Sequence, residues 1–351
     1  MIKNLVYLLV LGVAPAYGVV SFNDDVRPIL SDKCFHCHGP DEKNREAGLR
    51  LDTFEGAVAD HDGVRALVPG DLAKSEMWFR VTADDEEEVM PPPEAKLGML
   101  DEEELATIRS WIEEGGEYEG HWAFEAVGEV DAEGIDEIVK RGLAGRGLEM
   151  QPEAERERLI RRATFDLTGL PPSEEEVEAF LAGGDYGALV ERLLASPRFG
   201  ERMAVDWLDL ARYADTFGFQ VDRDRAVWPW RDWVVEAFNK NLPYDQFVTW
   251  QLAGDLLEDP TDEQILATAF NRLHQQKVEG GSTEEEFRVE YVADRLHTFG
   301  TAFLGLSLEC SRCHDHKFDP VLQKDYYQLF AFFQNVDEAG LYSYFTPSVP
   351  T

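Results

Sequence analysis

Cys34-Phe35-His36-Cys37-His38 ends a stretch of helical pattern that begins at Asp24. Val26, Ile29 and Leu30 have the spacing of one apolar helix face, and Asp24 is the expected N-cap. A short helix is therefore predicted to deliver this pentad, in which two cysteines lie one turn apart and a histidine follows the second.

The same pattern recurs near the other end of the 351-residue chain, and the two pentads use all four cysteines. Two thiols one helical turn apart can each bond to a vinyl carbon of haem, and the next imidazole then reaches the iron. The spacing predicts two covalently attached haem c groups, one held by Cys34, Cys37 and His38 and the other by Cys310, Cys313 and His314.

Three other uses of the cysteines stay open. A four-cysteine zinc site would join pairs roughly 270 residues apart, whereas zinc ribbons place theirs within a few tens. Disulfides give no reason for His38 and His314 to follow the pairs. A C-x-x-C redox pair lacks its usual βαβ setting here. We therefore expect haem attachment.

Residues 1–18 have the pattern of an export signal. Lys3 supplies a positive start, residues 5–13 are apolar, and residues 14–18 are mostly small, as at a cleavage site. No later run approaches the ~18 to 20 apolar residues of a spanning helix. We expect a soluble mature chain, exported to the periplasm or cell surface and without a transmembrane segment. An N-terminal membrane anchor is the alternative.

The chain is strongly acidic, with 69 acidic against 33 basic residues and a formal charge of −36. Such a surface repels phosphate, so nucleic acid is not expected as a partner. The acidity fits solubility or salt tolerance, and it also fits a cationic redox partner protein. The acidic run at residues 84–88 is expected to be a solvated loop, or alternatively a guide for such a partner.

The first iron needs a sixth ligand. Met90 is the first choice because the three prolines after it stiffen a loop that must hold a thioether over the iron. Met77 and Met99 are alternatives that we expect to pack instead. His36 and His61 are interpreted as surface residues.

The second iron's sixth ligand is less constrained. His274, after the apolar stretch 265–273, is the first choice. His316 is too close to His314 to reach the opposite face easily, and His297 is interpreted as a core residue of a long helix. An open or water-filled site is the remaining alternative.

Helical signals dominate and no alternating strand pattern competes with them, so the fold is predicted to be all-α. A small class I-like cytochrome c domain is expected at 19–120, a linker at 121–134, a larger helical domain at 135–345 and a tail at 346–351. Three helices are expected to begin at capping boxes, and a long helix over 284–308 should lead into the second pentad. The boxes are Asp101 with Glu104, Ser173 with Glu176, and Thr261 with Gln264.

The first third of the chain resembles the planctomycete-type cytochrome c domain. The segments that carry the resemblance are 21–38, 48–52, 90–92 and 121–124. In that family the methionine of the Met-Pro-Pro turn is taken as the sixth ligand, which implies Met90.

Most of residues 150–340 resembles the domain of unknown function that follows this cytochrome in planctomycete and verrucomicrobial proteins. The matching segments are 194–202, 207–215, 228–233, 251–257 and 310–320. The resemblance also implies a histidine after Asn-Arg, which is His274. Members usually continue into a further large domain, so this chain is expected to be a fragment or a naturally short member.

Two groups of side chains in the second part of the chain, one charged and one aromatic, can each be interpreted in two ways. The charged group is expected to form ion pairs rather than line an active site. The aromatic group is either a wall around the porphyrin or an ordinary helix core. The charged residues are Arg212, Asp215, Arg231, Asp232, Arg288, Glu290 and Arg295, and the aromatic ones are Tyr326, Tyr327, Phe330, Phe332 and Phe333.

Together these patterns predict an exported dihaem c-type cytochrome that transfers single electrons and is an electron carrier rather than a stand-alone enzyme. One alternative is a haem enzyme with an open second haem, either dihaem peroxidase-like or a cytochrome-coupled oxidoreductase on a carbohydrate-like substrate. Another is a binding or scaffold module at the cell surface.

Overall fold

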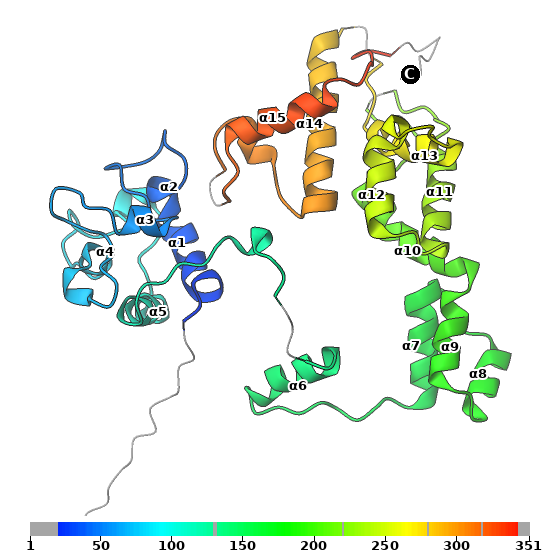
Figure 1. Cartoon of the computed structure of the whole chain (residues 1–351), viewed down its shortest axis with the longest axis horizontal. Coiled ribbons are helices and arrows are strands. Elements are labelled where there is room, and N and C mark those ends of the chain that lie inside the picture. The colour runs from blue at the N-terminus through cyan, green and yellow to red at the C-terminus, as the bar shows by residue number, and fades with distance from the viewer. Residues whose placement is uncertain (1–19, 129–131, 220, 279–280, 317–318, 343–351) are drawn as a thin grey trace, which may run out of the picture. The chain divides into compact units, whose positions relative to one another are not determined.

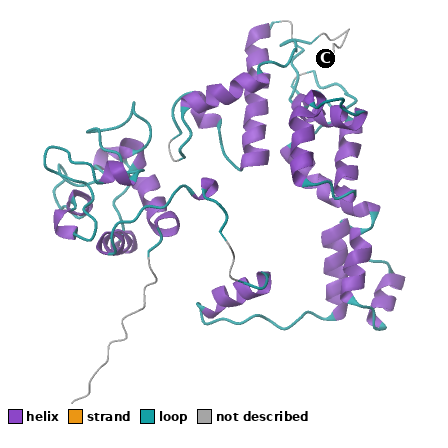
Figure 2. Cartoon of the chain, viewed as in Figure 1, coloured by secondary structure: helices purple, strands orange, loops and turns teal. Residues whose placement is uncertain are grey.

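The computed structural model describes residues 20–128, 132–219, 221–278, 281–316 and 319–342 (Figure 1). The predicted signal at 1–18 and tail at 346–351 lie outside these ranges. Helices joined by loops make up the described chain, which holds isolated bridges but no strand (Figure 2). The all-α prediction is confirmed. No helix in the described ranges is long and apolar enough to cross a membrane.

The chain divides into two compact units. The first comprises residues 1–128 together with 313–324, and the second comprises 129–312 together with 325–351. The segment 313–324, expected in the second domain, thus packs with the first unit. The boundary falls inside the second pentad, between Arg312 and Cys313.

The first unit consists of short helices around one apolar core. Their bounds are η1 Phe22–Val26, α1 Arg27–Lys33, α2 Phe35–His38, α3 Phe54–Ala57, η2 Leu72–Lys74, α4 Glu76–Val81, η3 Pro93–Ala95, α5 Glu102–Glu113 and η4 Trp122–Phe124.

The first helical stretch begins earlier than expected. Ser21, not Asp24, is the N-cap, and its hydroxyl accepts a hydrogen bond from the Asp24 amide at 3.2 Å. An extra π turn, η1, therefore precedes α1. Val26, Ile29 and Leu30 are buried as predicted, so the apolar face was correct although the cap was wrong.

α5 closes the first unit in the predicted way. Asp101 and Glu104 form the capping box, and Ile108, Trp111 and Ile112 are fully buried. The Trp111 indole donates to a backbone carbonyl at 2.8 Å, so its only polar atom is satisfied. Burying three side chains of this size contributes on the order of 1.5 to 3 kcal/mol each.

The second unit is larger. Its helices are α6 Ile135–Ala144, α7 Arg156–Thr168, α8 Glu174–Leu181, α9 Tyr186–Leu194, α10 Pro197–Leu210, α11 Trp228–Asn239, α12 Tyr244–Ala253, η5 Gly254–Leu256, α13 Asp262–Ala267, η6 Thr268–Arg272, α14 Glu284–Phe299, η7 Gly300–Leu304, η8 Glu309–Arg312 and α15 Gln323–Phe333. The capping boxes that start α8 and α13 are confirmed.

Two apolar clusters hold the second unit together. A small one joins α7, α8 and α9. A larger one is rich in aromatic side chains, and Trp207 and Trp230 donate their indole hydrogens to Gln251 and to the Ala267 carbonyl. Satisfied indoles of this kind fix the helices at defined positions.

The long helix predicted over 284–308 is shorter. α14 ends at Phe299, a π turn follows, and Gly305 takes a left-handed φ of 64°. A left-handed residue ends a helix because the next amides turn back toward its last carbonyls. Cys310 therefore lies on a separate 3₁₀ turn, η8.

Candidate haem-binding sites

The first pentad forms one continuous helical turn at the end of α1. The Cys34 amide donates to the Leu30 carbonyl at 2.8 Å, and the His38 amide donates to the Cys34 carbonyl at 2.9 Å. Cys34 and Cys37 are both half-buried, and Phe35 between them is buried in the core. The backbone thus holds two thiols and one imidazole in the relation that haem attachment needs.

The Cys34 thiol lies in an apolar setting. Burial raises its pKa to about 12, so the sulfur carries a proton, and it forms no disulfide. The Cys34 sulfur is therefore compatible with a thioether bond to haem.

His38 supplies the clearest test of fit. Burial lowers its pKa, so the ring is neutral, which is the form that binds a metal. Its Nδ1 is buried and has no hydrogen-bond partner in the described chain. Buried polar atoms without partners are rare and need an explanation. A ring held between an iron and the protein would provide one, and the first pentad fits haem c on this ground.

Met90 lies in the same unit, partly buried, after the buried Val89. Its amide donates to the Arg80 carbonyl at 2.9 Å, which ties the loop to α4. Met77 is buried in the core as expected, but Met99 is 48 % exposed, so the expectation that Met99 packs is wrong. Met90 as sixth ligand stays a prediction.

The histidines interpreted as surface residues, His36 and His61, are exposed. Neither belongs to the core of the first unit. That interpretation is confirmed.

The second pentad has different surroundings. Cys310, Cys313 and His314 are all exposed, and only Ser311 is buried. The His314 Nδ1 lies 2.7 Å from the Asp315 carbonyl, which orients the ring. The motif therefore presents its ligands at the surface rather than within a core.

A buried cluster that the sequence did not single out lies just beyond this pentad, in the first unit. The His121 Nε2 is 3.1 Å from the Asp319 carboxylate, and the Asp319 amide donates to the His316 Nδ1 at 2.9 Å. Burial lowers the pKa of His316, so its ring is neutral. These contacts tie His121 to residues 316 and 319, which the sequence analysis assigned to two separate family resemblances.

His274 is 1 % exposed and both of its ring nitrogens are engaged. Nδ1 lies 2.8 Å from the Gln275 carbonyl, and Nε2 lies 3.0 Å from the Arg295 Nη2. The Glu338 carboxylate pairs with the same guanidinium and lies 3.2 Å from Nε2. As placed, His274 has a structural role, and an iron could bind it only after these contacts break.

The charges in this network are set by burial and pairing. Burial would raise the pKa of Glu338, but hydrogen bonds from His274 and Arg295 outweigh it and lower the pKa to about 2. Burial lowers the pKa of His274, so the ring is neutral. The network is therefore an Arg–Glu ion pair that a neutral imidazole supports.

The other charged residues pair as expected. The pairs are Arg212 with Asp294, Arg231 with Asp232, Arg288 with Glu285 and Arg312 with Glu290, while Asp215 accepts from the Tyr213 hydroxyl. Among the aromatic group, Tyr326 and Phe330 are buried, whereas Tyr327 and Phe332 are exposed. One face of α15 is thus helix core, and the other faces solvent.

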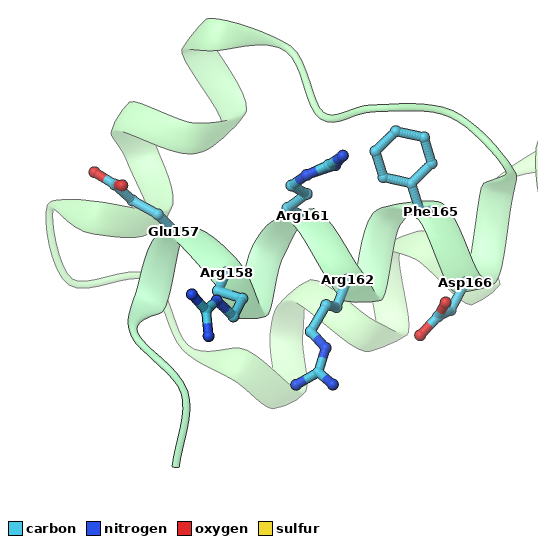
Figure 3. Close-up of a pocket in the computed structure, with 6 residues that line it drawn as sticks. All are labelled: Glu157, Arg158, Arg161, Arg162, Phe165 and Asp166. Carbon is cyan, nitrogen blue, oxygen red and sulfur yellow. The ribbon is translucent and has the colours of Figure 1, made fainter. Parts of the chain in front are cut away.

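Two hollows in the second unit are large enough to consider. One, of about 720 Å³, follows the surface of α7. Figure 3 shows Arg161 and Phe165 on one side of that helix and Arg158 and Arg162 on the other, so the side chains do not converge. The second, of about 640 Å³, lies between α14 and the loop after α10.

The fold and the first pentad define a c-type cytochrome domain joined to a larger helical domain. The family model described as Planctomycete cytochrome C matches residues 34–94, which contain the first pentad and Met90. The family model described as Protein of unknown function (DUF1549) matches residues 134–338, more than half of the chain. The chain therefore belongs to the DUF1549 family, with the cytochrome domain before it. No curated protein and no solved structure matches the chain significantly.

Proposed function

We propose that the protein is an exported dihaem c-type cytochrome that transfers single electrons. The observation that carries the proposal is the first pentad, where a half-buried imidazole with a buried, unpartnered Nδ1 follows two half-buried cysteines. A bound haem c would supply a one-electron Fe(III)/Fe(II) couple.

Residues of the first unit would then have separate roles in holding the haem. Cys34 and Cys37 would attach the group, and His38 would bind its metal. The Met90 thioether would be the other protein ligand, because a Met/His ligand set favours reduced iron and suits electron transfer. The apolar core around Phe35 would limit the access of water to the group.

An exposed acidic stretch beside Met90 supports a cationic redox partner. Residues 84–88 are exposed, and the Val89 and Glu88 amides donate to the Asp85 carbonyl, which folds the stretch into a tight turn. Charges near the cofactor speed association with a partner of opposite sign, and added salt weakens that effect. Electron transfer from this protein should therefore slow as ionic strength rises.

A second candidate function rests on the second pentad. Its exposed cysteines and histidine, together with a His274 that is already engaged, favour an iron with an open position. An open iron would permit chemistry on peroxide or on an organic substrate. A binding or scaffold role would be supported only if the purified protein had no haem absorption at all.

The decisive experiment counts haems and then changes one ligand. Pyridine haemochrome absorbance and mass spectrometry of the intact mature chain should give two covalent haems and a first residue near Val19. Fewer than two haems would contradict the dihaem proposal.

Reduced and oxidised spectra then test Met90. Met90→Ala should remove the methionine signature of a low-spin haem, whereas Met99→Ala, at an exposed position of the same unit, should leave it unchanged. An unchanged spectrum in Met90→Ala would contradict methionine ligation. A high-spin signal from wild type, with turnover of peroxide, would favour the second candidate.

A further inference from the structure

The cavity of about 640 Å³ in the second unit has walls from three separate stretches of chain. They are the loop 212–219, the segment 273–275 and the helix α14 between Phe287 and Asp294, and the Arg225 side chain also lines the cavity. A volume of this size is typical of sites for small organic ligands. It lies in the part of the chain that the DUF1549 family model matches.

The loop that forms one wall is pinned rather than loose. The Arg225 guanidinium donates to the carbonyls of Ala214, Leu273 and His274, at 3.2, 2.9 and 2.9 Å. The Gln276 amide donates to the Phe217 carbonyl at 2.9 Å. Two walls of the cavity are thus tied together, so the hollow exists before any ligand arrives.

Two residues with strained backbone conformations lie at this cavity. Arg212 and Phe219, both bulky, take left-handed φ values of 61° and 52°, next to Gly218 at 74°. Bulky residues avoid this region, and where they occupy it they tend to cluster at functional sites. Both strained side chains line the hollow.

The polar lining is electrically balanced. The Arg212 guanidinium pairs with Asp294, and Glu290 pairs with Arg312 at 3.0 Å. Neither pair leaves an excess charge for an ionic ligand, and the chain as a whole, at −36, repels anions. Even so, the Arg212 Nη2 is buried without a hydrogen-bond acceptor in the described ranges. The site therefore has one unpaired donor on Arg212, and the carboxylates of Asp294 and Glu290 can accept further hydrogen bonds.

Aromatic rings supply the apolar part of the lining. Phe219 and Phe287 meet edge to face, with ring centroids 5.8 Å apart, and Phe217 and Tyr291 complete the wall. Rings beside carboxylates and a guanidinium suit a molecule with both C–H faces and hydroxyl groups. A purely apolar ligand would strip water from Asp294 and Glu290 without replacing their hydrogen bonds.

We propose that this cavity binds a neutral polyhydroxylated compound, the class that includes sugars and polyols. Its hydroxyl oxygens would accept from Arg212, its hydroxyl hydrogens would go to Asp294 and Glu290, and its C–H faces would lie on Phe219 and Phe287. The proposal concerns the second unit alone and does not depend on the number of haems or on electron transfer.

Isothermal titration of the full haem-loaded chain tests this, with glucose, galactose, mannose and myo-inositol as neutral probes. Glucuronate is the anionic comparison and phenol the apolar one. At least one neutral probe should bind at millimolar concentration, and neither comparison compound should bind more tightly than it does. No binding of any neutral probe, or tighter binding of glucuronate or phenol, overturns the proposal.

Two variants locate the binding. Arg212→Gln and Phe219→Gly should each weaken it about tenfold or more, which corresponds to a lost hydrogen-bonding or stacking group. Arg198→Gln, whose exposed pair with Glu201 lies elsewhere on α10, should bind like wild type. Glycine adopts the φ of Phe219 without strain, so Phe219→Gly should fold even if Arg212→Gln does not. Wild-type affinity in Phe219→Gly overturns the proposal.

Discussion

The two Cys-x-x-Cys-His pentads have the same spacing but lie in opposite environments. Cys34, Cys37 and His38 are half-buried at the end of α1, and Phe35 and Cys34 pack in the core of the first unit. Cys310, Cys313 and His314 are exposed on a short turn that follows the left-handed Gly305. A motif of five residues specifies the bonds a cofactor can make, whereas the surrounding chain decides how far water reaches it. Solvent exposure is one of the properties that set a haem's potential, so the two sites should not be equivalent.

The units also differ in what stabilises them. In the first, Phe35 and Cys34 of the pentad pack in the core. In the second, a buried network of Arg295, Glu338 and His274 contains no residue of either pentad. The stability of the second unit should therefore be separable from the second pentad, which lies across the boundary of the two units, whereas the stability of the first unit should depend on the first pentad.

The largest effect is expected from breaking the buried network. Arg295→Met leaves the Glu338 carboxylate buried without its partner, which should cost about 3 to 5 kcal/mol of unfolding free energy. Chemical denaturation would measure the loss, and the haem count should not change. Arg288→Met removes an exposed pair from the same helix and should cost less than about 0.5 kcal/mol. Equal losses of unfolding free energy in Arg295→Met and Arg288→Met would show that the buried network stabilises the second unit no more than an exposed ion pair does.

The next largest effect is expected at the first pentad. Cys34→Ala combined with Cys37→Ala should remove one haem and lower the stability of the first unit by about 3 kcal/mol, because loss of the group leaves the apolar surface around the pentad without its packing partner. Haem absorbance and thermal unfolding report the two effects separately. His36→Gln, at the exposed position between the cysteines, should change neither. A double variant that keeps both its haem count and its stability would contradict the comparison.

As pH falls, the unfolding free energy of the second unit should decrease at a higher pH than that of the first unit. The folded pKa of Glu338 is about 2 against an ordinary 4.5, so the stabilisation is fully present above 4.5 and is lost as pH falls toward 2. By pH 3 the loss should reach about 2 kcal/mol. The lowered pKa of His274 acts in the same direction below its ordinary value, because protonation then favours the unfolded chain. Denaturation midpoints between pH 7 and 3 measure this, and Glu338→Gln should flatten the profile.

The smallest effect on stability is expected at the second pentad. Cys310→Ala combined with Cys313→Ala should change the unfolding free energy by less than about 0.5 kcal/mol, because both side chains are exposed. The haem count should nevertheless fall from two to one. A large loss of stability would mean that the second motif is part of a core after all, and an unchanged haem count would mean that it carries no haem.

Local signals predicted local structure well. The capping boxes at Asp101, Ser173 and Thr261 are present because each depends only on residues three positions apart. The helix over 284–308 was predicted too long because its apolar spacing continues past Phe299, whereas Gly305 and the π turn before it redirect the chain. The cap at Ser21 was missed because Asp24, equally able to cap, lies only three residues later.

Such local signals could not predict contacts between residues that are far apart in the sequence. His274 was expected to face an iron, yet its partners Arg295 and Glu338 come from α14 and from the segment after α15. The cluster of His121, Asp319 and His316 likewise joins distant residues, since His121 and Asp319 are 198 positions apart in the sequence. No spacing rule connects such positions, because the chain must first fold to bring them together.

By itself the sequence determined the all-α class, the two Cys-x-x-Cys-His pentads and the helices that begin at capping boxes, since each follows from the order of neighbouring residues. Only the tertiary structure decided which pentad is buried, which histidine nitrogens are already engaged and where a cavity forms. Burial and long-range hydrogen bonds depend on how the helices pack. The same five-residue pattern is therefore half-buried at Cys34, Cys37 and His38 and exposed at Cys310, Cys313 and His314.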